Sequence, residues 1–110
     1  MGKPNDLVQG TLDLLILKTL LPDAMHGWAI AKRIQQLSGE VLQVQQGSLY
    51  PALHRLIKRG WISVEDGTSE NNRRAKFYRL TKAGRGHVEV ETKQWQTIAL
   101  AMANALKATT

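Results

Sequence analysis

The chain has 110 residues, of which 43% are hydrophobic and none is cysteine. This length supports one compact core but not two independent domains, and the lack of cysteine excludes disulfide bonds and thiolate metal sites. The formal net charge is +6, which favours an anionic partner.

The positive charge is concentrated in one segment. Residues 47–86 contain nine Lys and Arg but only three Asp and Glu, which accounts for the whole excess. Purely apolar runs such as residues 14–17 and 98–103 are far shorter than the roughly 20 residues of a membrane span, and no signal peptide is evident. We therefore expect a cytoplasmic protein that binds nucleic acid rather than a membrane surface.

Helical periodicity predicts a first helix over residues 11–21, ended by Pro22. This helix has two apolar faces. One face consists of Leu12, Leu15, Ile16 and Leu20, and the other of Leu14, Leu17 and Leu21. A domain of this size can cover one face by itself, so the second face indicates a partner subunit.

A second helix is predicted over residues 27–37, closed by Ser38 and Gly39. We expect its apolar side chains to point into the core. They are Trp28, Ile30, Ile34 and Leu37, with Trp61 as a further core residue. His26, at the start of the helix, is expected to cap or support it rather than bind a metal.

The third helix is predicted to open near residues 47–48, with Ser48 as N-cap and Pro51 in the first turn, and to end at Gly60. One arc of this helix is apolar, and the opposite arc carries cations and hydrogen-bonding groups. A helix of this kind can read base edges and hold phosphates in a major groove. The predicted DNA contacts are Ser48, Tyr50, His54, Arg55, Lys58 and Arg59.

After residue 60 the pattern changes from helical to alternating. Residues 61–65 and 76–80 alternate and predict a β-hairpin, whose tip spans residues 66–74. A mobile loop with accidental charge is the simpler interpretation of this tip. Its cations also suit a wing laid along the DNA backbone or into the minor groove. The predicted wing contacts are Asn72, Arg73, Arg74 and Lys76.

Thr81 suits the N-cap of a last helix that runs to about Lys107. An apolar stripe follows this helix through Val88, Trp95, Ala99, Met102 and Leu106. The element order predicts a mainly α fold with a small β-hairpin, that is, a winged helix-turn-helix with a long C-terminal dimerisation helix. Residues 1–81 would form the DNA-binding region and residues 82–110 the dimerisation helix, within one compact domain.

Three segments resemble the PadR-like family of bacterial winged helix-turn-helix transcriptional regulators. Residues 26–34 begin with His-Gly and an aromatic, residues 47–53 read Gly-Ser-Leu-Tyr-Pro-Ala-Leu, and residues 78–84 fit Tyr-x-Leu-Thr-x-x-Gly. The resemblance covers about residues 8–100. It implies a homodimeric regulator of double-stranded DNA, commonly a repressor, in which Ser48 and Tyr50 contact DNA near Arg55 and the wing.

Only one helix follows residue 84, so the chain resembles the short-form subgroup of that family, whose first and last helices intertwine between subunits. The residues expected in this dimer interface are Leu14, Leu17, Leu21, Val88, Trp95, Ile98, Ala99, Met102 and Leu106. Some short-form members hold flat aromatic compounds between tryptophans of the last helix. Trp95 would then contact a small aromatic effector, although filling the dimer seam is the simpler role for it.

Other function classes have less support. No nucleophile, carboxylate pair or metal-ligand spacing is recognisable, His54 and His87 lack ligand partners at suitable spacing, and we expect no enzyme activity, cofactor or metal. A winged-helix module that docks on an acidic protein remains the alternative to a DNA-binding regulator. Steep salt dependence and competition by DNA would distinguish the two.

Overall fold

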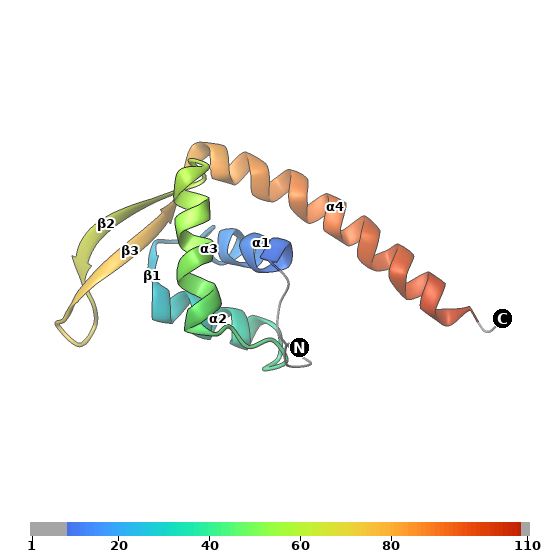
Figure 1. Ribbon diagram of the computed structural model, residues 1–110, viewed down its shortest axis with the longest axis horizontal. Coiled ribbons are helices and arrows are strands. Elements are labelled where there is room, and N and C mark those ends of the chain that lie inside the picture. Colours follow the sequence, from blue (N-terminus) through green and yellow to red (C-terminus); the bar gives the residue numbers. More distant parts are fainter. Residues whose placement is uncertain (1–8, 109–110) are drawn as a thin grey trace.

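The computed structural model describes residues 9–108 and has the predicted fold class: helices lie to one side of a small antiparallel sheet, and one long helix projects from the body (Figure 1). The elements in chain order are α1 (Gln9–Thr19), β1 (Met25–His26), α2 (Gly27–Leu37), α3 (Gln46–Lys58), β2 (Ile62–Thr68), β3 (Arg74–Leu80) and α4 (Lys82–Lys107). The outer limits of the predicted regions 1–81 and 82–110 lie outside the described residues.

Side-chain caps start two of the helices where the sequence predicts them. The Nδ1 atom of His26 accepts a hydrogen bond from the backbone N–H of Ala29 at 3.3 Å, which confirms His26 as a cap of α2. At α4, the hydroxyl of Thr81 accepts from the Gly84 N–H at 3.1 Å and donates to the Gly60 carbonyl at 2.7 Å. Thr81 therefore also fixes the start of α4 to the end of α3.

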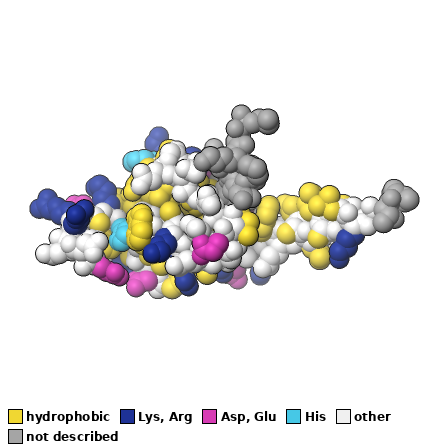
Figure 2. All heavy atoms as spheres, turned by 90° about the horizontal axis from the view of Figure 1, so that it is seen from below, with side chains coloured by type: hydrophobic (Ala, Val, Ile, Leu, Met, Phe, Trp, Pro, Cys, Tyr) yellow, Lys and Arg dark blue, Asp and Glu magenta, His cyan; other side chains and the backbone are white. Residues whose placement is uncertain are grey.

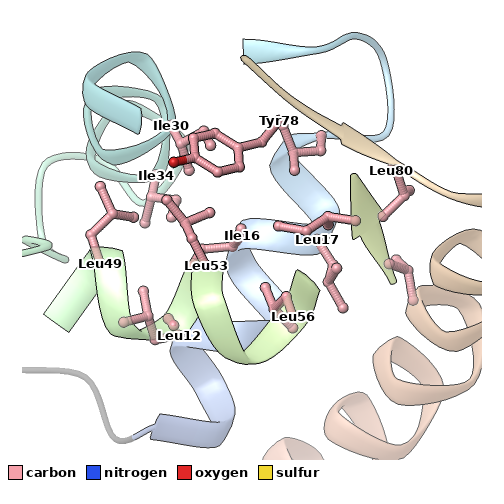
Figure 3. Packing of buried hydrophobic residues seen from close by; sticks show 14 residues of the cluster. Leu12, Ile16, Leu17, Ile30, Ile34, Leu49, Leu53, Leu56, Tyr78 and Leu80 are labelled. Atoms are coloured by element: carbon pink, nitrogen blue, oxygen red, sulfur yellow. The ribbon is translucent and has the colours of Figure 1, made fainter. Parts of the chain in front are cut away.

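The core lies where α1, α2 and α3 meet the sheet and the first turns of α4 (Figure 3). Its buried members are Leu12, Ile16, Leu17, Leu20, Ile30, Ile34, Leu49, Ala52, Leu53, Leu56, Ile62, Tyr78, Leu80 and Val88. Figure 3 shows side chains from α1, α2, α3 and β3 pointing toward one another. This packing fixes α3 with one arc inward and the other toward solvent.

The hairpin and α3 are longer than predicted. α3 begins at Gln46 with Gln45 as N-cap, so Ser48 is not the cap and Pro51 falls in the second turn rather than the first. The strands pair from Ile62 with Leu80 out to Thr68 with Arg74, so the tip contains only residues 69–73. At the outer end of the hairpin both faces of the strands are largely exposed, so these polar residues form strands without an alternating apolar pattern. The sequence therefore does not mark them as strand residues.

The sheet has a third strand that the sequence does not predict. In β1, Met25 pairs with Tyr78 and His26 with Phe77, giving the order β1-β3-β2. Two residues are too few to produce an alternating pattern. This short pairing places the start of α2 beside the wing strand β3.

Four hydrophobic residues lie in other surroundings than predicted. Leu17 and Val88, predicted at the dimer interface, are buried in the subunit's own core. They are covered because α1 packs directly on α4 of the same chain. Trp28 and Leu37 were expected in the core but are 61% and 59% exposed. Trp28 lies on the side of α2 opposite the buried Ile30 and Ile34, and Leu37 is the last residue of the helix.

The second half of α4 extends beyond the body, and the described residues measure 57 Å along their longest axis. Every residue from Lys93 to Lys107 is exposed. Apolar side chains remain along this projecting arm, as Figure 2 shows. The large ones are Trp95, Ile98, Leu100, Met102 and Leu106. Within the described part of the chain, these five side chains are between 46% and 77% exposed.

Candidate nucleic-acid interface

The outward arc of α3 forms one wall of the candidate interface. Because Leu49, Leu53 and Leu56 are buried, the residues between them on the helix face solvent. Ser48, Tyr50, His54 and Lys58 are all exposed along this arc. The structure therefore presents these four predicted recognition-helix residues in positions from which a flat or grooved partner can be contacted.

A groove of about 490 Å³ separates α3 and the start of α2 from the wing. The helices contribute His26, Gly27, Trp28 and Tyr50 to its lining, and the hairpin contributes Ser69, Glu70, Asn71, Arg73, Arg74, Ala75, Lys76 and Tyr78. Three cations and one carboxylate line it, so an anion is the ligand class favoured there. Lys and Arg side chains gather at this end of the molecule, with some acids among them (Figure 2).

Tyr50 lies against the backbone of α2. A Cβ atom added at Gly27 would come within 3.0 Å of the Tyr50 hydroxyl oxygen, so a glycine permits this close approach. Across the groove, burial and the nearby Tyr50 raise the pKa of Tyr78 above its usual value. Tyr78 is therefore a neutral phenol at physiological pH, and its hydroxyl keeps its proton.

The wing tip is a compact turn. The Ser69 N–H donates to the Arg73 carbonyl at 2.8 Å, the Asn72 N–H donates to the Ser69 carbonyl at 2.9 Å, and Asn72 adopts a left-handed conformation with φ of 59°. Asn tolerates this region better than most residues. Arg73 and Arg74 are both exposed, while Lys76 forms only a solvent-exposed ion pair with Asp66 at 3.6 Å. All four predicted wing residues are thus accessible to a partner.

Arg55 and Arg59 lie at the edge of this surface, Arg55 half-buried and Arg59 exposed. The guanidinium of Arg55 turns toward α1 and forms an ion pair of 2.8 Å with Asp13, with the two side chains 28% and 14% exposed. Arg59 lies over the ring of Trp61, 5.1 Å from its centroid. Both residues lie on the flank of the outward arc. A helical wheel does not tell whether a side chain at this flank contacts DNA or a neighbouring element of the same chain. We assign Arg55 a role in positioning α3, whereas Arg59 remains accessible to a partner.

Replacing Arg55 by Ala should destabilise the fold by about 2 kcal/mol, because the Asp13 carboxylate is left largely buried without its partner. Asp13→Ala should have a similar effect, and the double variant should lose clearly less than the sum of the two. Urea unfolding measures all three. The control is Arg79→Ala, whose ion pair with Glu65 spans 3.5 Å and is exposed on both sides. This change should cost below about 0.5 kcal/mol. Equal losses for Arg55→Ala and Arg79→Ala would contradict a structural role for Arg55.

Sequence reasoning missed two residues beside the groove. Trp28 was expected in the core and Lys32 was not singled out, yet the Lys32 ammonium lies 4.8 Å from the centroid of the Trp28 ring. The pattern that could have identified them is an aromatic in the first turn of α2 with a cation one turn later, on the side of the helix opposite Ile30 and Ile34.

Neither a metal-ligand cluster nor a membrane-spanning helix is found in residues 9–108. No three His, Asp or Glu residues among them are grouped so that they could hold a metal ion. None of the helices in this part of the chain is both long and apolar enough to cross a membrane.

Comparisons with known proteins agree with this geometry. The chain is 27% identical over 94 residues to an uncharacterised protein from Lysinibacillus sphaericus, with 86% of each chain covered. It superimposes on a transcriptional regulator from Clostridium thermocellum with a TM-score of 0.80 and 27% identity, covering 90% of this chain and 96% of the other. A PadR family transcription regulator from Clostridium difficile gives a TM-score of 0.74 and 28% identity, covering 88% and 99%.

A model of the transcriptional regulator PadR-like family matches residues 16–90. This segment contains α2, α3, the whole hairpin and the first turns of α4, and so includes the groove and the outward arc of α3. The related proteins of named function are transcriptional regulators rather than enzymes. The chain therefore belongs to the PadR-like family of transcriptional regulators, which act by binding DNA.

Proposed function

We propose that this regulator is a repressor that binds a pseudo-palindromic operator as a homodimer. The observation that carries the proposal is the position of the outward arc of α3 beside a cationic groove whose far wall is the wing. A duplex seated there would place α3 in the major groove, while Arg73 and Arg74 would meet the backbone or the adjacent minor groove. Phosphate contacts of this kind set affinity, and residues on α3 would select the sequence.

The projecting arm of α4 supports the homodimer. The helical stripe that packs Val88 into the core continues outward through Trp95, Ile98, Met102 and Leu106, all exposed in the single chain. A contiguous apolar strip of this kind marks an interaction surface. A second copy of the chain would cover it with its own α1 and α4, and Leu14, Leu21 and Ala99 lie within reach of the same seam. Leu17 and Val88 are not part of the proposed dimer seam, because their own subunit buries them.

A dimer of this design controls the separation of its two α3 helices, which must match successive major grooves about 34 Å apart. A small aromatic effector would act by binding one subunit arrangement better than the other. A hollow of about 300 Å³ between α1 and α4 is lined by Trp95 together with Leu14, Glu91, Gln94 and Ile98. Trp95 is the residue we assign to effector contact there, at the edge of the proposed seam.

Fluorescence anisotropy with DNA from upstream of the protein's own gene, compared with shuffled DNA at several salt concentrations, tests the proposal. We expect tight, sequence-dependent binding that weakens steeply as salt rises. Arg73→Ala should weaken binding to both DNAs and reduce the salt slope by about 1. Lys107→Ala is the matched control, because this cation lies at the far end of α4 from the wing (Figure 1) and should leave the slope unchanged. Two results would favour an acidic protein partner instead. One is DNA binding that does not change with salt, and the other is equal affinity for upstream and shuffled DNA.

A further inference from the structure

Trp28 is the most exposed aromatic side chain in the winged-helix body, with 61% of its surface accessible. It lies in the first turn of α2, at the opposite end of the molecule from the projecting part of α4 (Figure 1). The proposed dimer seam therefore does not cover it. Its indole N–H donates no hydrogen bond within the described part of the chain. An exposed indole of this kind suits a partner that offers both an apolar surface for the ring and a hydrogen-bond acceptor for the N–H.

Neighbouring side chains hold the indole in place. The His26 ring stacks beside it, with centroids 6.3 Å apart and planes inclined by 17°, and His26 is itself fixed by the edge of Phe77 at 5.6 Å and by its capping bond. The Lys32 ammonium lies over the ring at 4.8 Å. Because these contacts hold the indole in one orientation, the Trp28 side chain loses little conformational entropy when a ligand binds it.

Trp28 and Tyr50 together form the ridge between two hollows. One is the groove of about 490 Å³ that faces the wing, and the other is a hollow of about 440 Å³ bordered by Lys32, Gln35 and residues 44–46. Cations therefore flank the indole on both sides: Lys32 next to it, and Arg73, Arg74 and Lys76 across the groove. Glu70 is the one acidic residue in the lining of either hollow among the described residues.

We propose that Trp28 contacts the DNA backbone directly: its indole N–H donates to a phosphate oxygen, its ring packs on the adjacent deoxyribose, and Lys32 adds a charge to the same strand. This inference rests on the proposed function and adds a third contact region to α3 and the wing. A nucleotide backbone offers the required combination, since each sugar presents an apolar face beside an anionic acceptor. The contact is to the backbone, so it contributes affinity without selecting sequence.

Affinity measurements on three variants test the contact. Trp28→Ala should weaken binding to upstream DNA and to shuffled DNA by the same factor, about tenfold or more, and leave the salt slope unchanged because indole is neutral. Trp28→Phe should retain part of the affinity, because it keeps a ring but loses the donor. Lys32→Ala should lower the salt slope by about 1. Leu37→Ala, on the same helix and 59% exposed, is the matched control and should bind as the wild type does.

A spectroscopic measurement reports on the same contact independently of affinity. In the Trp61→Phe/Trp95→Phe double variant, Trp28 is the remaining tryptophan. Saturating duplex DNA should protect its fluorescence from acrylamide quenching. An unchanged quenching constant, or Trp28→Ala affinities equal to those of wild type, would overturn the inference while leaving the proposed function intact. A wild-type protein that binds no DNA would instead refute the proposed function itself.

Discussion

Replacing Gly84 by Ala should unfold the protein or destabilise it by about 3 kcal/mol or more. A Cβ atom at this position would clash with the backbone carbonyl oxygen of Trp61 and lie 2.8 Å from a Leu80 methyl carbon. That carbonyl also accepts the Thr81 N–H at 3.0 Å, so it cannot withdraw without breaking the junction between the sheet and α4. The glycine is what allows α4 to start directly against the end of the hairpin.

Gly86→Ala provides the control for this prediction. Gly86 lies two residues further along the same helix, and a Cβ atom there meets nothing within 4 Å. Alanine should stabilise the helix by up to about 1 kcal/mol at such a position. Urea midpoints measured at one fixed protein concentration compare the two variants. Similar midpoints for Gly84→Ala and Gly86→Ala would contradict the close approach of α4 to Trp61.

Met102→Asp should convert the proposed dimer into monomers and abolish tight operator binding. The substitution places a carboxylate in the apolar seam twice, once for each subunit, and should weaken dimerisation about a hundredfold or more, since an unpaired charge loses its hydration there. Sedimentation should show the wild type at twice its chain mass of 12.3 kDa and the variant at the chain mass. Each monomer retains only one half-site contact, so the gain from simultaneous binding is lost as well.

Asn104→Asp is the matched control for the dimer prediction. It introduces the same charge two residues along α4, on the side of the helix away from the Trp95, Ile98 and Met102 stripe. We expect it to sediment and bind DNA as the wild type does. A wild-type protein that sediments as a monomer at micromolar concentration would refute the homodimer, and dimers that persist in Met102→Asp would place the seam elsewhere.

Local chemistry made much of the fold predictable. The bounds of α2, the His26 and Thr81 caps and the end of α3 at Gly60, which has φ of 77°, all depend on residues close together in sequence. The strand β1 is different. It exists because β3 happens to lie beside residues 25 and 26, and its pairing carries no signal in its own two residues.

The candidate site was predicted only in part, for a similar reason. A helical wheel identifies which residues leave the core, and this placed Tyr50, His54 and Lys58 correctly on the outside of α3. It does not identify the neighbour at the flank of the arc, so Arg55 was assigned to DNA although Asp13 from α1 binds it. Trp28 was wrongly assigned to the core instead of the surface, because an apolar ring at the end of a helix fits a core or a surface contact equally well.

The projecting arm of α4 is helical before any partner arrives. Starting a new helix is unfavourable by a factor of about a thousand, but here the first turns are already formed, capped by Thr81 and packed through Val88. The arm only extends an existing helix, and alanines at positions 99, 101, 103 and 105 favour that extension. The subunit would therefore offer the partner copy of the proposed dimer a rigid rod rather than a coil. Association would proceed as the docking of preformed surfaces, without waiting for a folding step.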